Sequence, residues 1–139
     1  MFVFENTDGL MYATLQSAGF DIRSTVDVYI PPGGFVSIKT GLKIIGVNLS
    51  NGIPELQIRS RSSLITKHQV SVLGGVGTVD ADYRGEISIP LMNFGSEEFF
   101  IAKGDRVAQG VCSIIHQIMG IPVKGVIRGL GGHGSTGVK

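Results

Sequence analysis

The sequence predicts an all-β domain, a sandwich or a barrel, and three observations support this fold class. Short segments that alternate apolar and polar residues recur along the chain, as expected for strands that bury one face. Clusters of glycine, proline and aspartate separate these segments at short intervals, which is typical of sandwiches and barrels. A helical pattern occurs in one short stretch, SSLITKHQ at residues 62–69.

The predicted strands follow one another in a single domain, the usual organisation for a chain of 139 residues. They are residues 26–30, 35–45, 55–60 and 86–94, and two strands within 97–115 on either side of a Lys-Gly-Asp turn. A Pro-Pro-Gly-Gly turn separates the first two strands, and the short helix serves as a connector. We expect residues 1–124 to form the β-barrel domain and the glycine-rich residues 125–139 to form a flexible arm.

Composition and charge limit the class of protein. Cys112 is the only cysteine, which excludes an intrachain disulfide and a cysteine-rich zinc site. The net charge of +1 argues against a long nucleic-acid-binding surface, which needs a basic face. The chain has neither an apolar run near the ~20 residues of a membrane span nor an N-terminal leader pattern. We therefore expect a cytoplasmic or other intracellular protein that makes no membrane contact and does not bind nucleic acid directly.

The low share of charged residues indicates a homo-oligomer. Asp, Glu, Lys and Arg make up 17% of the chain, against about 25% in an average protein. A small domain has a large surface for its volume. Because few charges are available to cover that surface, we expect another subunit to bury part of it.

The glycine-rich run GLGGHGSTG at residues 129–137 nearly matches two phosphate-binding motifs. Both motifs need a helix after the loop, and no helix can follow here; Ser135 also stands where the phosphate-loop lysine belongs. The backbone amides of the run, the hydroxyls of Ser135 and Thr136 and the guanidinium of Arg128 could instead wrap polyphosphate oxygens. The alternative is a disordered tail.

The stretch GTVDADYRG at residues 77–85 contains two carboxylates, Asp80 and Asp82. On an extended strand, residues two apart face the same side, so the pair could hold a metal or polarise a water. Alternatively, the segment is a hairpin whose aspartates accept hydrogen bonds from turn amides. The spacing alone leaves both interpretations open.

Five stretches resemble, in order, the five motifs of the trimeric deoxyuridine triphosphatase (dUTPase) family. They are AGFDI at 18–22, RSSL at 61–64, GTVDADYRG at 77–85, GDRVAQ at 104–109 and RGLGGHGSTG at 128–137. One match alone would be weak, whereas five in order are highly specific. The resemblance implies a jelly-roll-like, distorted β-barrel subunit with one short helix in a three-fold homotrimer. It also implies active sites that each use all three chains, and a terminal arm needs no helix if it closes over a neighbour's site.

The reaction implied by the resemblance is hydrolysis of dUTP to dUMP and pyrophosphate, by in-line attack of water on the α-phosphorus. This reaction keeps uracil out of DNA and supplies dUMP for thymidylate synthesis. By the same resemblance Asp80 orients and deprotonates the water, a role that suits a carboxylate ionised at neutral pH, and Asp82 is structural. Two alternatives remain: a dCTP deaminase of the same fold, and a dUTPase-like regulatory module that binds a protein partner.

The segment ahead of Asp80 is expected to be a hairpin that selects the base and the sugar. Its implied substrate-binding residues are Gly74, Gly75, Gly77, Thr78, Val79 and Tyr83. The glycines let the backbone approach the ligand closely, so that main-chain groups can pair with the uracil edge. Tyr83 is expected to pack beneath the deoxyribose and leave no room for a 2′-hydroxyl.

The resemblance also assigns groups that bind the triphosphate and complete the site. They are Arg61, Ser62, Ser63, Gln109, Arg128, His133, Gly134, Ser135 and Thr136. A Mg²⁺ ion is expected to bridge the phosphate oxygens and to keep most of its waters. Asp21 is the candidate for a water-mediated contact with this ion, with a β-turn aspartate as the alternative. Arg106 is expected to be an internal ion-pair partner of Asp21 or Asp82.

Three positions depart from the family pattern. His133 stands where the family usually has an aromatic residue stacked on the uracil, so we expect weaker closure of the arm and some pH dependence. Ser63 replaces a glycine, and Ser60 replaces a proline, which should soften the turn before Arg61.

Three other residues are expected to have no role in the chemistry. His68 is predicted to lie on the surface, and His116 to be a hydrogen-bonded histidine within an apolar strand. Cys112 is predicted to be a small core residue.

Overall fold

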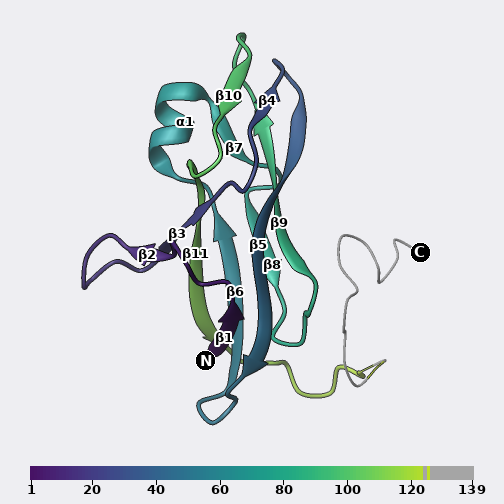
Figure 1. The fold of residues 1–139 in the computed structure, drawn as a ribbon. Coiled ribbons are helices and arrows are strands. Elements are labelled where there is room, and N and C mark those ends of the chain that lie inside the picture. The colour runs from purple at the N-terminus through teal and green to yellow at the C-terminus, as the bar shows by residue number, and fades with distance from the viewer. Residues whose placement is uncertain (124, 126–139) are drawn as a thin grey trace.

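The structure, a computed structural model, describes residues 1–123 and 125 of the chain. Within these residues the elements are β1 (Phe2–Glu5), β2 (Met11–Tyr12), β3 (Phe20–Arg23), β4 (Val28–Ile30), β5 (Phe35–Val47), β6 (Ile53–Arg59), α1 (Ser62–His68), β7 (Val70–Val72), β8 (Val76–Val79), β9 (Glu86–Asn93), β10 (Phe99–Ile101) and β11 (Arg106–Ile115). Most strands belong to two antiparallel sheets, which are stacked in Figure 1. The predicted all-β, jelly-roll-like subunit with one short helix is confirmed for this part of the chain.

The two sheets enclose the hydrophobic core. One has the strand order β1-β5-β9-β7 and the other β2-β3-β11-β6-β8, while β4 and β10 form a separate pair. On β9, Ile87, Ile89 and Leu91 are buried and the residues between them are half-buried. Leu56 and Ile58 of β6 are buried from the second sheet. The apolar and polar alternation that predicts these two strands therefore reflects one face packed in the core.

Several strand boundaries differ from those predicted. β4 begins two residues later than the predicted strand, at Val28, and β5 extends past the predicted end to Val47. The two strands predicted within residues 97–115, β10 and β11, join different sheets. The sequence does not predict β1, β2, β3, β7 and β8, each of which has at most four residues. Strands this short offer too few alternating positions for periodicity to detect.

The segment before Asp80 is divided between the two sheets rather than folded into one hairpin. β7 pairs with β9, whereas β8 pairs with β6. The turn between them contains Gly74 and Gly75, whose φ angles are +83° and +87°. Side chains rarely adopt this left-handed conformation, so the two glycines permit the turn that sends the chain from one sheet to the other.

Of the three predictions about the burial of His68, Cys112 and His116, two are wrong and one is confirmed. Cys112 is exposed; its partner across the sheet, Leu56, is fully buried, so the core covers β6 at this level but not β11. His116 lies one residue beyond the end of β11 and is exposed. His68 is on the surface as predicted, with its ring 4.7 Å from that of Phe99.

Within residues 1–123 and 125, no helix is long and apolar enough to cross a bilayer, since α1 has seven residues.

Candidate active site

Most of the predicted site residues that the structure describes line two separate pockets. The tyrosine pocket, of about 260 Å³, is lined by Ile58, Val72, Leu73, Gly77, Thr78, Val79, Asp80, Tyr83, Ile87, Ser88 and Pro90. The arginine pocket, of about 290 Å³, is lined by Ala13, Ser17, Ala18, Gly19, Asp21, Arg61, Ser62, Ser63, Arg106 and Gln109. The first is mostly apolar and the second is mostly polar and charged.

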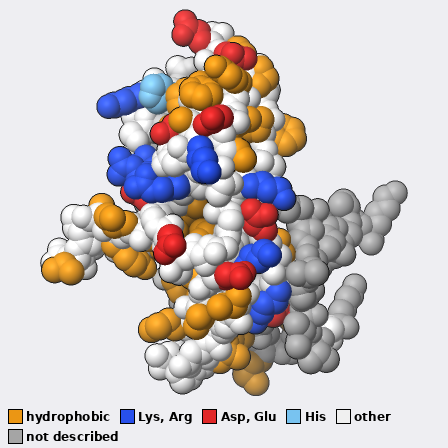
Figure 2. All heavy atoms as spheres, in the orientation of Figure 1, with side chains coloured by type: hydrophobic (Ala, Val, Ile, Leu, Met, Phe, Trp, Pro, Cys, Tyr) orange, Lys and Arg blue, Asp and Glu red, His pale blue; other side chains and the backbone are white. Residues whose placement is uncertain are grey.

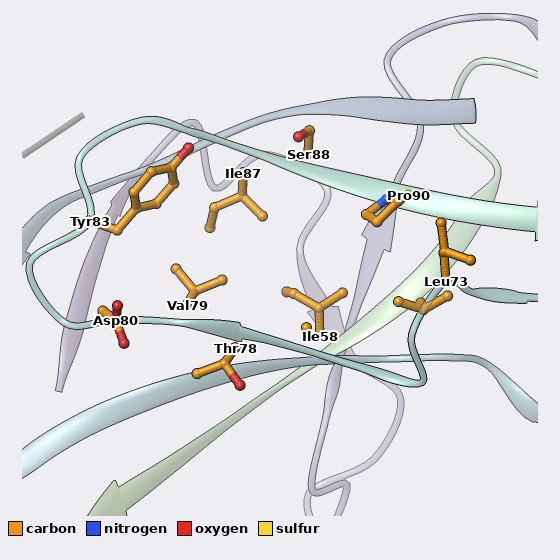
Figure 3. Close-up of a pocket in the computed structure, with 11 residues that line it drawn as sticks. Ile58, Leu73, Thr78, Val79, Asp80, Tyr83, Ile87, Ser88 and Pro90 are labelled. Carbon is orange, nitrogen blue, oxygen red and sulfur yellow. The ribbon is translucent and has the colours of Figure 1, made fainter. Parts of the chain in front are cut away.

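The tyrosine pocket forms where the chain passes from β8 to β9. β8 pairs with β6, so that Gly77 lies opposite Ile58. Asp80 follows the last residue of β8, and its carbonyl accepts a hydrogen bond from the amide of Tyr83 at 3.1 Å. Figure 3 shows Asp80 and Tyr83 on the connection between the two strands, beside the pocket. A tight turn therefore brings a carboxylate and an aromatic ring to the same cavity.

Two further groups fix this turn. The Arg84 guanidinium donates to the carbonyl of Ala81 at 2.8 Å and to that of Tyr83 at 3.0 Å. The Tyr83 hydroxyl donates to the carbonyl of Glu86 at 3.1 Å. Both ends of the tyrosine are thus attached to the backbone, and the ring forms a fixed wall of the pocket.

Four of the six residues predicted to bind the base and sugar line the tyrosine pocket: Gly77, Thr78, Val79 and Tyr83. Gly74 and Gly75 lie in the preceding turn instead. The sequence did not indicate the apolar lining from other strands, such as Val72 of β7 and Pro90 of β9. Their contribution depends on which strands are neighbours, and the sequence pattern carries no such information.

The arginine pocket is assembled around one carboxylate. Antiparallel pairing of β3 with β11 places Asp21 opposite Gln109. Arg61 Nε donates to Asp21 Oδ1 at 2.9 Å, and Arg106 Nη1 donates to Oδ2 at 3.2 Å. Arg61 Nη1 also donates to the carbonyl of Arg106 at 3.2 Å. The predicted ion pair between Arg106 and Asp21 is confirmed.

These charges make the arginine pocket suited to an anion. Two guanidinium groups and one carboxylate leave one net positive charge, and the Asp21 side chain is only 17% exposed. The hydroxyls of Ser62 and Ser63 and the amide of Gln109 add neutral donors to the lining. Figure 2 shows basic side chains gathered on the surface below α1. A phosphate chain matches this combination of charge and donors.

Hydrogen bonds of Ser60 attach the turn before Arg61 to two neighbouring strands. Ser60 Oγ accepts a hydrogen bond from the amide of Val72 at 2.8 Å and lies 2.9 Å from Ser71 Oγ. The Ser60 carbonyl accepts a hydrogen bond from Gln109 Nε2 at 3.0 Å. The serine therefore ties the start of α1 to β7 and to β11.

The residues present fit a metal carried by the substrate. In residues 1–123 and 125 no group of three or more His, Cys, Asp or Glu side chains could hold a metal ion. Each Asp21 oxygen accepts one arginine hydrogen bond and keeps a further lone pair. This carboxylate can therefore accept a hydrogen bond from a water of a Mg²⁺ shell, whereas a direct bond would compete with the arginines.

Asp80 and Arg61 of one chain lie apart along β6. The pairing of Leu56 with Val79 places Asp80 level with Glu55, while Arg61 lies two residues beyond the end of β6 at Arg59. The four steps from Glu55 to Arg59 span about 13 Å at ~3.3 Å per residue. Among the described residues, the predicted carboxylate and the predicted phosphate-binding groups therefore line separate cavities.

The remaining predicted residues, Arg128, His133, Gly134, Ser135 and Thr136, lie outside the residues that the structure describes.

Comparison with known proteins gives consistent matches over nearly the whole chain. A dUTPase family model matches residues 5–137. The deoxyuridine 5'-triphosphate nucleotidohydrolase of Anaplasma marginale is 45% identical over 131 residues, which cover 91% of this chain and 86% of that protein. A dUTPase structure from Streptococcus mutans has a TM-score of 0.72 at 25% identity, over 86% of this chain and 98% of that one. A dUTPase mutant of phage phi11 of S. aureus, whose structure shows a coordinated structural Mg(II) ion, has a TM-score of 0.74 at 19% identity, over 90% of this chain and 97% of that one.

Proposed function

The chain belongs to the dUTPase family, and from this membership we propose that it hydrolyses dUTP to dUMP and pyrophosphate. The observation that carries the proposal is the presence of Asp80 and Tyr83 in one pocket of about 260 Å³. The cavity joins an apolar, strand-lined space for a base and sugar to a single carboxylate at its edge. Such a cavity can hold a nucleoside and act on the group attached to it.

The chemistry assigned to Asp80 is general-base catalysis. The carboxylate accepts a proton from a water molecule while the water oxygen attacks the α-phosphorus. The bond between the α-phosphorus and the bridging oxygen breaks, and pyrophosphate leaves with the bonding electrons. Asp80 then releases the proton to solvent. Phosphoryl transfer of this kind asks the protein mainly for positioning and for stabilisation of charge.

The arginine pocket supplies that stabilisation. Arg61, Ser62, Ser63 and Gln109 donate hydrogen bonds to phosphate oxygens, and Asp21 holds the Arg61 guanidinium in place. Mg²⁺ bound to the triphosphate would offset part of its negative charge, with Asp21 in contact through a water.

We further propose a homotrimer in which each site takes the tyrosine pocket from one chain and the arginine pocket from another. The presence of Asp80 and Arg61 in separate pockets of one chain supports this arrangement. The arm of a third chain would close the site with the groups that lie outside the described residues. These are Arg128 for the γ-phosphate, His133 over the uracil, and Gly134, Ser135 and Thr136 for the phosphates. The enzyme would work inside the cell, where deoxynucleotide pools are kept.

A product assay tests the reaction. The protein is incubated with dUTP, dCTP, dTTP or UTP and Mg²⁺, and pyrophosphate and ammonia are measured. We expect pyrophosphate from dUTP alone. Ammonia from dCTP would instead indicate a deaminase, and the absence of both products would indicate a regulatory module.

A mixing experiment tests the shared sites. The variants Asp80→Asn and Arg61→Ala each damage one pocket, and they are refolded together in equal amounts. If the pockets of a site come from different chains, roughly one site in four regains both intact pockets. Activity of the mixture that stays at the level of the separate variants would rule out sharing of these two pockets.

A further inference from the structure

The ring of Tyr83 occupies the space in which a side chain at Gly85 would begin. A Cβ atom built on Gly85 would lie 2.3 Å from the Tyr83 hydroxyl oxygen, 2.5 Å from Cζ and 2.9 Å from Cε2. Real Cβ atoms essentially never approach other heavy atoms within 3.0 Å. The φ angle of Gly85 is outside the left-handed region, so the backbone itself would accept alanine. What this position requires is the absence of a side chain.

A displacement of the Tyr83 ring would break the hydrogen bond of its hydroxyl group. Its hydroxyl donates to the carbonyl of Glu86 at 3.1 Å. The Glu86 carboxylate is in turn held by β5, through the amide of Gly41 at 3.0 Å and Lys39 Nζ at 3.3 Å. The carbonyl that receives the hydroxyl therefore belongs to a residue tied to the neighbouring strand. A methyl group at Gly85 would break the hydroxyl bond by displacing the ring.

The position of the ring also sets the shape of the tyrosine pocket. Tyr83 lines this pocket beside Asp80, Val79 and Ile87, whereas Gly85 is not part of the lining. In Figure 3 the ring extends from the turn toward the side of the pocket formed by β9. Gly85 thus acts on the pocket only through the ring. A ring that leaves this position changes the shape of the cavity next to the reacting carboxylate.

We propose that Gly85 is a specificity-determining residue that holds the Tyr83 ring where it excludes a 2′-hydroxyl. This inference rests on the proposed function, in which the pocket binds the deoxyribose of dUTP. The absence of a side chain at Gly85, together with the hydroxyl bond to Glu86, keeps the wall beneath the sugar close and rigid. Discrimination between deoxyribose and ribose then depends on a residue that does not touch the substrate.

The test is the ratio of kcat/KM for UTP to that for dUTP in the Gly85→Ala variant. We expect this ratio to rise at least about tenfold, because loss of steric rejection of a small group changes selectivity by roughly this factor or more. The matched control is Gly46→Ala, where the new Cβ would lie at an ordinary 3.5 Å from Val3. The control should keep the wild-type ratio. A rise in KM for dUTP with an unchanged ratio in Gly85→Ala would overturn the proposal.

A double-mutant cycle separates an action through the ring from any other effect. In a Tyr83→Ala background the ring is absent, so adding Gly85→Ala should leave the ratio as it is in the single Tyr83→Ala variant. A further shift of similar size would show that Gly85 acts by another route. If the wild-type protein releases no pyrophosphate from dUTP, the proposed function is wrong. If the wild-type protein is active and an active Gly85→Ala variant keeps the wild-type ratio, only the role proposed for Gly85 is wrong.

A second variant covers the case in which Gly85→Ala does not fold, as judged by loss of a cooperative thermal transition. Tyr83→Phe removes the hydroxyl bond to Glu86 and keeps the ring. The freed ring should raise the UTP to dUTP ratio a few-fold. An unchanged ratio in this variant would contradict the role assigned to the anchored ring.

Discussion

The tyrosine pocket and the arginine pocket recognise a ligand in different ways. The first is walled by apolar side chains and strand backbone, and Asp80 is its one carboxylate. The second contains two guanidinium groups that share the Asp21 carboxylate. In the proposed function, shape and backbone hydrogen bonds select the ligand in the first pocket, whereas charge binds it in the second. The comparison teaches that the proposal assigns selectivity and phosphate affinity to separate parts of this chain.

The two pockets also differ in how the chain builds them. Most of the tyrosine pocket comes from the contiguous segment between Gly77 and Pro90. The arginine pocket joins Asp21, Arg61 and Arg106, which come from three distant parts of the sequence. Substitutions in the two pockets should therefore have separable effects, on the chemical step in one and on phosphate binding in the other.

The largest effect is expected from Asp80→Asn in the tyrosine pocket. Asparagine keeps the size of the side chain but cannot accept the proton of the attacking water. We expect kcat to fall about 10²- to 10⁴-fold, the range of general-base catalysis, while dUTP still binds. Steady-state kinetics and calorimetric binding measure the two quantities. Asp82→Asn, two residues away, is the matched control and should keep kcat; a loss of less than tenfold in Asp80→Asn would remove Asp80 from its assigned role.

A smaller effect, on binding, is expected from Arg61→Ala in the arginine pocket. Loss of one charged hydrogen-bond donor costs about 1.5–3 kcal/mol, so kcat/KM for dUTP should fall roughly 10- to 100-fold. Most of the loss should appear in KM, which steady-state kinetics resolves. Arg59→Ala is the control, since Arg59 bonds to Gln57 and lines neither pocket. Equal losses of kcat/KM in the two variants would show that the effect comes from the lower net charge of the protein and not from a contact of Arg61 with the substrate.

Glu86, whose carbonyl accepts the Tyr83 hydroxyl bond, should make the stability of the fold depend on pH. The hydrogen bond from the Gly41 amide lowers the pKa of Glu86 below its ordinary value of 4.5. Because the folded-state pKa is lowered, the ionised carboxylate stabilises the fold above the ordinary value, and this stability is lost as pH falls through the folded-state pKa. Glu86→Gln should therefore lower Tm by a few degrees at pH 7. The difference from wild type should shrink as pH falls below 4.5; a constant difference across pH would contradict the prediction.

The smallest effect is expected from His133→Phe, in the part of the chain that the structure does not describe. An imidazole titrates near pH 6.5 and offers less stacking area than phenylalanine. The substitution should lower KM for dUTP by a few-fold and flatten its change between pH 5.5 and 8. Measurement of KM across this range decides it, and identical profiles for both proteins would show that His133 does not stack on the substrate.

The sequence predicts the long strands, but it does not show that the candidate site residues are divided between two pockets. β5, β6 and β9 have enough alternating positions for periodicity to identify them. β3 has only four residues, although its alternation of buried Phe20 and Ile22 with Asp21 and Arg23 is clear once its pairing is known. Such a short segment gains its strand identity from its neighbours in the sheet.

The wrong prediction that Cys112 is a core residue has a similar cause. Its position on β11, level with Leu56, is compatible with an inward orientation, and an apolar strand context favours burial. Burial also requires that the opposite sheet extend over that position, and the sequence pattern of one strand does not report the extent of another. The two-pocket division of the site depends on strand register in the same way.

The placement of β11 has a consequence for biosynthesis. This strand lies between β3 and β6, and its residues 106–115 are made long after those two strands. Until it leaves the ribosome, both neighbours have an unpaired edge, which invites association with other chains. Pairing across such a sequence separation is slow, so a nascent chain of this protein should be prone to association with other chains until β11 is made. Only then can Asp21 meet Arg106.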